Sequence, residues 1–374
     1  MHISIYTILI GTFINSCCLT AFFDRCYDQV RLYTRWPDGR VKKPPGSSRF
    51  SLFIPEHAMA DHRVHAGVDT CQWGYFDAVS EPVLRIKSGD RVTIDTVSGN
   101  KMYLPPADKF NIPAALVEIH QKLQPAPGPH ILTGPVYVEG AKPGMVLEVK
   151  IEDVTLLTNW GLNTIRPLSG TLPYDFDDVY STLIPLDLDR KVGKLSWGLD
   201  LPLAPFFGIM SVAPPKNWGR VTSVVPRAFG GNLDNKELVA GTTLYLPIFT
   251  EGALFTCGDG HGVQGDGEVN VNAIETSMQG TFTLTVRDDL NFVYPRAETP
   301  THYITMGMDP DLDQCAVMAL RDMIVLLGEK ANLSREDAYM LCSLAGDLRV
   351  TQTVNVSKGI HMMMAKSIVH ATRS

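Results

Sequence analysis

The chain has 374 residues, of which 45% are hydrophobic and 20% charged, and its formal net charge is −7. This balance is typical of a globular protein with a sizeable core, and it excludes a disordered chain and a protein with many membrane spans. The negative charge offers no basic surface for nucleic acid, so we expect a small-molecule partner.

The N-terminal segment predicts a leader or an anchor over residues 1–23. Residues 3–23 are apolar and carry no charge, and Leu19-Thr20-Ala21 is a passable signal-peptide cleavage site. Since no later segment is long and apolar enough to cross a bilayer, we expect membrane contact at this leader at most. The five cysteines after it have no Cys-x-x-Cys spacing, which argues against a disulfide framework and a structural zinc site.

Residues 24–50 are polar and rich in Pro, Gly and Ser, so we expect an extended arm. After it comes a dense group of His, Asp and aromatic residues, which is a candidate second source of metal ligands. The group consists of His57, Asp61, His62, His65, Asp69, Trp73, Tyr75 and Asp77.

A first domain over residues 51–230 is expected to be β-rich. Apolar and polar residues alternate over 83–97 around Ser88-Gly89-Asp90, and again over 136–154 around a Pro-Gly turn, which predicts two hairpins. Short strands separated by such turns favour a sandwich or a distorted barrel. His130 precedes the second pair of strands, where loops commonly carry ligands.

The second domain, residues 231–374, is expected to be intertwined with the first. Strands are predicted over 242–248, 269–274 and 281–286, with Glu275 between the last two. One helix is expected to begin at Asp309-Pro310 and a second at Ser334, ending at Gly346. The fold class is therefore mainly β with a smaller α/β part and C-terminal helices, α+β overall.

The stretch from Gly258 to Glu268 has the composition of a functional site. Five glycines permit sharp turns and close approach of a ligand, and among them stand Asp259, His261, Gln264, Asp266 and Glu268. The alternative is a hairpin loop in which Asp and Gly only satisfy the geometry of the turn.

Several common reactions are excluded, because the chain has no Walker loop, dinucleotide fingerprint, Gly-x-Ser-x-Gly elbow or His-Glu-x-x-His helix. Metal-assisted hydrolysis remains. Asp259 and His261 would project to the same side of an extended backbone and reach one ion, with His130 or the early His/Asp group completing its ligands.

The sequence resembles the acetamidase/formamidase family from about residue 50 to 366. The matching stretches are His130–Val136 with Val138–Gly144, Pro226–Asn235, Gly258–Glu268, Glu298–His302, Thr351–Asn355 and Gly359–His361. The resemblance implies hydrolysis of short aliphatic amides to ammonia and a carboxylate, a β-rich fold with an added α/β part, and a homo-oligomer, dimer or higher. It also implies a cytoplasmic location, with secretion as the alternative if residues 1–21 are a true signal peptide.

The resemblance supports a set of site residues that we interpret as follows. His130, Asp259 and His261 are expected to hold a divalent metal, zinc by preference and calcium as the alternative, and Glu268 is expected to activate water as general base. Gln264 and Asn232 would hold the amide or the oxyanion, Asp266 would belong to the catalytic set, and Asp234 would line the same cavity.

Two other functions stay open at the level of the sequence. One is a non-catalytic β-sandwich binding protein that keeps the glycine turns for structure. The other is an amidase for a larger amide, whose pocket would be walled by Trp160, Trp218, Phe206, Phe207 and Tyr75.

Overall fold

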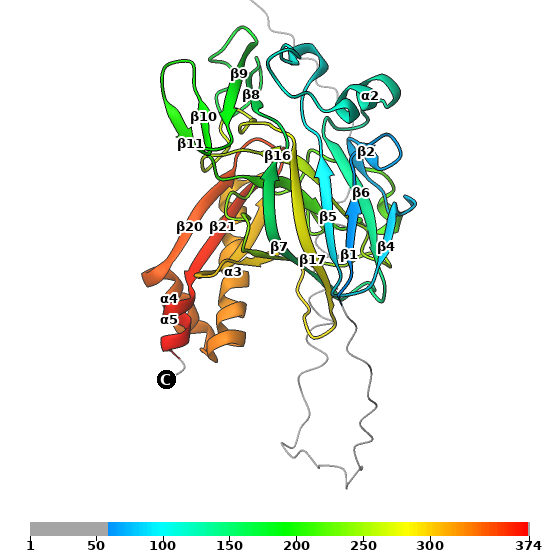
Figure 1. Ribbon diagram of the computed structural model, residues 1–374. Coiled ribbons are helices and arrows are strands. Elements are labelled where there is room, and N and C mark those ends of the chain that lie inside the picture. Colours follow the sequence, from blue (N-terminus) through cyan, green and yellow to red (C-terminus); the bar gives the residue numbers. More distant parts are fainter. Residues whose placement is uncertain (1–58, 373–374) are drawn as a thin grey trace, which may run out of the picture. The chain divides into compact units, whose positions relative to one another are not determined.

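A sheet of nine strands is the largest element of the computed structural model, which describes residues 59–372 (Figure 1). Its strands come from all parts of that range. In spatial order they are β1 (Asp61–Val64), β5 (Arg91–Thr96), β17 (Met278–Arg287), β7 (Val146–Leu156), β15 (Thr243–Pro247), β18 (Arg296–Glu298), β19 (His302–Asp309), β21 (Lys358–Ala365) and β20 (Gly346–Gln352).

A second sheet of six strands carries most of the candidate site. Its strands in order are β14 (Gly230–Asn232), β12 (Phe206–Ser211), β16 (Phe255–His261), β6 (Ile131–Val138) and β2 (Cys71–Trp73), with β4 (Leu84–Ile86) also paired to β6. Two smaller sheets complete the strands. They consist of β11 (Asp200–Pro202), β10 (Val192–Lys194), β9 (Tyr180–Asp187) and β8 (Trp160–Ile165), and of β13 (Val221–Thr222) with β3 (Tyr75–Phe76).

The main hydrophobic core contains residues of both large sheets. The Phe282 ring of β17 lies 5.5 Å from the Phe207 ring of β12 and 5.4 Å from the Phe255 ring of β16, measured between centroids. All three side chains are fully buried, so aromatic packing joins the two sheets face to face. The mainly β fold is confirmed, and within residues 59–372 no sheet closes into a barrel.

Both predicted hairpins are wrong in their pairing, although their strands exist. β4 pairs with β6 and β5 pairs with β1 and β17, so the turn at Ser88–Asp90 connects the two large sheets. In the same way β6 and β7 belong to different sheets. Local alternation of apolar residues predicts a strand, but the partner of that strand depends on the core it covers.

The C-terminal helices cover the end of the nine-stranded sheet formed by β19, β21 and β20 (Figure 1). α3 (Leu312–Ala331) begins after Asp311, whose side chain caps it, two residues later than Asp309. α4 (Arg335–Ala345) has Ser334 as its N-cap and is followed by Gly346, as predicted. α5 (Lys366–Ala371) follows β21, and all three helices share a separate core with these strands.

Three shorter elements were not predicted. They are α2 (Ala114–Lys122) and the 3₁₀ helices η1 (Lys101–Tyr103) and η2 (Lys216–Trp218). α2 belongs to a third core cluster, with Trp160 and Ile131. The strand expected over 269–274 is absent, because these residues form turns and bends between β16 and β17.

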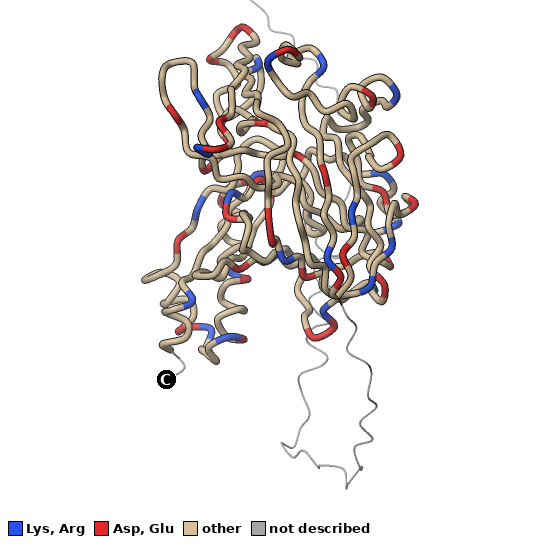
Figure 2. The backbone as a smooth tube through the Cα atoms, viewed as in Figure 1, with Lys and Arg blue, Asp and Glu red and all other residues tan. Residues whose placement is uncertain are grey.

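The domain boundary at residue 230 stays a prediction, although strands from both sides of it, such as β7 and β15, pair in one sheet. The leader, the extended arm and His57 lie outside the described residues. Between residues 59 and 372, no helix is long and apolar enough to cross a membrane. The four cysteines of this range, Cys71, Cys257, Cys315 and Cys342, are free thiols, and acidic and basic residues are interspersed along its strands and loops (Figure 2).

Candidate active site

Strand β16 forms the floor of the site. It is buried along its whole length between β12 and β6, and Asp259 and His261 follow each other at alternate positions near its end. Their spacing brings both side chains to the same side, as predicted, and Asp259 Oδ2 lies 3.4 Å from His261 Nε2.

Gly208 of β12 gives these side chains their space. A Cβ atom at this position would stand 2.5 Å from Asp234 Oδ1, 2.7 Å from Asp259 Oδ2 and 2.8 Å from His261 Cε1. Real Cβ atoms do not approach other heavy atoms so closely, so any larger residue would displace the carboxylates. The floor of the site therefore requires glycine here.

Two further groups lie beside this pair. Glu275 Oε1 lies 3.5 Å from His261 Nε2, and His130 Nε2 lies 3.9 Å from Asp259 Oδ2. His130 comes from the loop before β6, and its other ring nitrogen, Nδ1, lies 2.8 Å from the hydroxyl of buried Ser223. The ring is thereby held with Nε2 towards Asp259, so Asp259 has a predicted ligand on either side, and the role of the three as ligands stays a prediction.

Gln264 determines the tautomer of His261. His261 Nδ1 donates to Gln264 Oε1 at 2.9 Å, and Gln264 Nε2 donates to the backbone carbonyl of Asp234 at 2.8 Å. With a proton on Nδ1, a neutral imidazole has its lone pair on Nε2, the form in which histidine binds metals. Gln264 makes a hydrogen bond at each end of its amide and does not line the cavity, so the structure does not support the prediction that it contacts an amide substrate.

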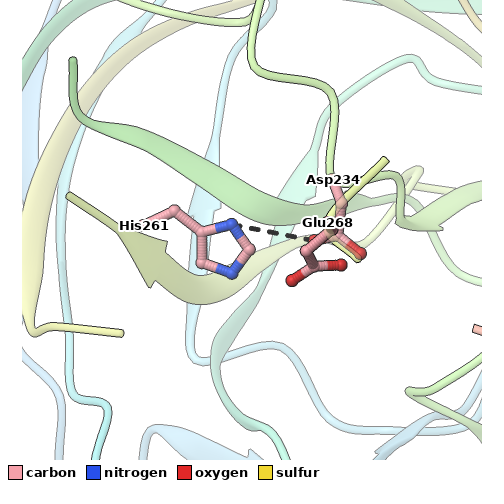
Figure 3. Close-up of side chains that lie close together, drawn as sticks. All are labelled: Asp234, His261 and Glu268. Carbon is pink, nitrogen blue, oxygen red and sulfur yellow. Dashed lines mark ion pairs between the residues drawn. The ribbon is translucent and has the colours of Figure 1, made fainter. Parts of the chain in front are cut away.

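Asp234 and Glu268 lie on the other side of His261, and all three side chains face one another (Figure 3). Asp234 Oδ1 is 3.9 Å from His261 Nδ1, and Asn355 donates a short hydrogen bond to Asp234 Oδ2. Glu268 is 6% exposed and reaches the cavity from the end of the glycine-rich stretch.

The backbone is strained at three of the carboxylates. Asp234, Asp259 and Glu268 have φ values of 47°, 58° and 44°, in the left-handed region that non-glycine residues rarely adopt. Such conformations cost free energy and persist where the surrounding structure imposes them, often at functional sites.

Several polar atoms of the site are buried without a hydrogen-bond partner. They are His261 Nε2, Glu268 Oε2, Asp234 Oδ1 and Asn232 Oδ1. Burial of an unpaired polar atom is costly, so such atoms require a ligand, an ion or ordered water. Imidazole nitrogen and carboxylate oxygen are ligands of divalent metals such as zinc, and the donor set therefore fits a metal ion.

The electrostatics of the site agree with this fit. Burial, reinforced by the charge of Asp259, raises the pKa of Asp234 to about 7 and that of Glu275 to about 8, and burial with Asp234 raises the pKa of Glu268 well above its usual value. The raised pKa values mean that these carboxyl groups keep their protons, because too little positive charge lies nearby to stabilise their ionised forms. A divalent cation would supply the missing positive charge.

The two imidazoles respond in opposite ways. Burial lowers the pKa of His130, which keeps it neutral. Burial would also lower the pKa of His261, but Glu275, Asp259 and Asp234 together raise it well above its usual value. Burial would raise the pKa of Asp259, whereas His130 and His261 hold it well below its usual range.

Asp266 does not belong to this cavity, contrary to prediction. Its carboxylate lies on the protein surface, 2.7 Å from Arg349 Nη2 and 3.1 Å from Lys236 Nζ. The glycines on either side turn the chain, so Asp266 points away from the site although Glu268 points into it.

The early His/Asp group also lies elsewhere. His62 pairs with Asp90, His65 with Asp95 and Asp61 with Arg91 at the edge formed by β1 and β5. Of the members of this group from Asp61 onward, which the structure describes, only Trp73 lines the cavity.

Glu275 and Asn355 are the two site residues that the sequence analysis did not identify. Glu275 lies in the irregular segment before β17, and Asn355 lies between β20 and β21. Gln352 Oε1 accepts hydrogen bonds from the backbone of Val354 and Asn355 and so shapes the loop that presents Asn355 to Asp234. In the sequence, Glu275 could be noticed only because it lies between two predicted strands. Asn355 could be noticed only because it belongs to a stretch that matches the family.

The site opens into a cavity of about 850 Å³. His130, Asn232, Asp259, Glu268, Glu275 and Asn355 are among the residues that line it. Asn232 Nδ2 donates to the carbonyl of Val224, and its Oδ1 is buried without a partner. Oδ1 suits the N–H group of a ligand, whereas an oxyanion would need the second N–H of Nδ2.

Comparison with known proteins gives concordant results. The sequence model of the acetamidase/formamidase family matches residues 80–221 and 217–369. An acetamidase of Mycolicibacterium smegmatis is 48% identical over 199 residues, 38% of this chain and 49% of that protein. The matched stretches span about half the length of the curated relatives.

Solved structures are similar over nearly their full length. A crystal structure of an acetamidase from Bacillus halodurans has a TM-score of 0.72 and 30% identity, covering 83% of this chain and 100% of that one. A predicted acetamidase/formamidase from Thermoanaerobacter tengcongensis has a TM-score of 0.74 and 26% identity, covering 84% and 99%.

Proposed function

Because the chain belongs to the acetamidase/formamidase family, we propose that it hydrolyses the carbon–nitrogen bond of short linear amides, of the formamide or acetamide type. Water and the amide give a carboxylate and ammonia. The observation that carries this proposal is that His130 and His261 lie on either side of Asp259 at one cavity, whose lining also includes Glu268 with an unpaired carboxylate oxygen.

A divalent cation is part of the proposal. His130 Nε2, Asp259 Oδ2 and His261 Nε2 would hold it, with the Glu275 carboxylate close enough to take part. Two imidazoles favour zinc, since calcium prefers a shell of oxygen atoms. When bound, such an ion polarises a carbonyl group and increases the acidity of water.

The roles of the remaining residues follow from their free atoms. Glu268 Oε2 is buried and unpaired at the cavity. Once a cation beside it compensates its charge, the ionised carboxylate would take a proton from the attacking water and return it to the leaving nitrogen. Asn232 Oδ1 would accept a hydrogen bond from the amide N–H. Gln264 and Asn355 would act as positioning residues, through His261 and Asp234 respectively.

Ammonia release from formamide and acetamide tests the proposal. Glu268→Gln retains the shape of the side chain but removes the base, and general-base catalysis contributes about 10²- to 10⁴-fold to rates. We expect a loss of kcat in that range, with Glu139→Gln, at an exposed position away from the cavity, as the matched control. Unchanged ammonia release in Glu268→Gln would contradict the assignment of the base.

The homo-oligomer and the cytoplasmic location implied by the family stay predictions. Light scattering after size-exclusion chromatography measures the first, and fractionation of the producing cells measures the second.

A further inference from the structure

The cavity is much larger than a short amide requires. Acetamide occupies about the volume of two or three water molecules, roughly 30 Å³ each. The cavity measures about 850 Å³. Pockets that bind drug-sized ligands measure about 300–1,000 Å³, and this cavity falls in that range. Acetamide would leave most of it filled with water.

Part of the cavity lining is aromatic, beside polar residues such as Lys101 and Arg166. Trp73, Tyr103 and His120 form this aromatic wall, and Leu162 lies in the lining with them. Trp73 Nε1 donates to the carbonyl of Pro129 at 2.7 Å, and His120 Nε2 lies 2.9 Å from the carbonyl of Gly99. Because the one polar atom of the Trp73 ring is already paired with the backbone, this ring offers apolar surface to a ligand.

The wall is built as a rigid unit. The Trp73 and His120 rings meet edge to face with centroids 4.8 Å apart. Trp73 and Tyr103 pack against the third core cluster, which is separate from the main core and contains Leu116, Ile119 and Trp160, and His120 is joined to it through Trp73. The cavity therefore has the acidic site residues in its lining, together with an aromatic part whose Trp73 and Tyr103 rings are held by a separate core.

The aromatic residues expected from the sequence do not form this wall. Trp160, Phe206 and Phe207 are fully buried in the cores, and Trp218 and Tyr75 do not line the cavity. The cavity is wider than acetamide needs, as expected, but its aromatic lining consists of Trp73, Tyr103 and His120.

We propose that the aromatic part of the cavity lining, Trp73, Tyr103 and His120, receives a ring-sized apolar acyl group, so that the preferred substrate is a primary amide of the phenylacetamide type. This inference rests on the proposed amide hydrolysis. The amide group binds at the acidic site residues, and the ring packs against Trp73 and Tyr103. Its hydrolysis gives the arylacetate and ammonia, with water as the only co-reactant.

The test compares phenylacetamide with acetamide on the purified full-length protein, in kcat/KM from ammonia release and in Kd from calorimetry. We expect kcat/KM for phenylacetamide to exceed that for acetamide by about tenfold or more, which corresponds to about 1.4 kcal/mol. Tyr103→Ala should lower kcat/KM for phenylacetamide by about tenfold and leave acetamide within about twofold. Tyr174→Ala, at a residue that is 84% exposed and remote from the cavity lining, is the matched control.

The outcomes separate the two proposals. The inference is overturned if kcat/KM for acetamide equals or exceeds that for phenylacetamide. It is also overturned if Tyr103→Ala lowers kcat/KM equally for both amides. Either result leaves the amidase proposal intact. If phenylacetamide binds more tightly than acetamide but neither amide is hydrolysed, the result supports ring binding by the aromatic residues of the cavity and overturns the proposed function. Failure of phenylacetamide to bind overturns the inference whatever the activity.

Discussion

His261 Nδ1 donates a hydrogen bond to Gln264 Oε1 at 2.9 Å, and the opposite nitrogen of the same ring is buried without a partner beside Asp259 and Glu275. One amide thus determines which nitrogen of the central histidine is free to bind a ligand. The glycine-rich stretch from Gly258 to Glu268 contains both residues, and its turn brings Gln264 back to the His261 ring.

Removal of this hydrogen bond should weaken the site without unfolding the protein. Loss of a residue that orients a metal-binding histidine typically costs 10- to 100-fold in metal affinity or activity. We expect Gln264→Leu to show a loss of this size in zinc affinity and in kcat. Gln121→Leu, at an exposed position of α2, is the control. Wild-type zinc affinity and kcat in Gln264→Leu would contradict the role of Gln264.

Gly208→Ala should abolish activity, because the new methyl group would stand 2.5 Å from Asp234 Oδ1 and 2.7 Å from Asp259 Oδ2. Gly265→Ala is a suitable control, since a Cβ at this position of the same site meets no atom within 4 Å. Ammonia release and bound zinc should be lost together in the first variant and retained in the second. An active Gly208→Ala variant would show that the carboxylates do not act from their positions in the structure.

Glu275→Gln should reduce the zinc content of the protein, since it removes a negative charge 3.5 Å from His261 Nε2 while its volume is retained. The measurement is elemental analysis after dialysis against a buffer with a fixed concentration of free zinc. Glu139→Gln again serves as the control. Full zinc content together with full activity in Glu275→Gln would remove Glu275 from the site.

Asp266→Asn should leave kcat within about twofold and alter acid stability instead. Burial would raise the pKa of Asp266, but Arg349 and Lys236 outweigh it and hold this pKa below its usual value of 3.8. A lowered pKa contributes stability that is complete above about pH 4 and is lost as the pH falls through the native value. The pair is partly exposed, so the expected difference is below about 1 kcal/mol.

Urea unfolding at several pH values between 2 and 6 measures this difference. Above pH 5 wild type should be more stable than Asp266→Asn, and the two should converge at the lowest pH. A large loss of kcat in Asp266→Asn would return this residue to the catalytic set.

The sequence predicts the local features of this molecule well and the long-range ones poorly. Asp259 and His261 could be placed together because alternate residues of a strand share a face, and Ser334 could be identified as a helix cap because capping is local. The turn at Ser88–Asp90 has the sequence of a hairpin, but it connects two sheets. β5 pairs with β17, and β4 pairs with β6.

The same limit applies to the site. Glu275 reaches His261 through a segment without regular structure, and Asn355 reaches Asp234 across 121 positions of sequence. Neither contact has a periodic signal. Asp266 and Glu268 are chemically similar neighbours, and only the turns between them decide which one faces the cavity.

The most direct test of the account is ammonia release from acetamide by the protein as purified, after removal of metal with a chelator, and after return of zinc. The account predicts release by the purified protein, its loss on metal removal and its recovery with zinc. Release that persists undiminished in protein shown to be free of metal, or its absence in zinc-loaded protein, would contradict the central claim that His130, Asp259 and His261 form a metal-dependent amidase site.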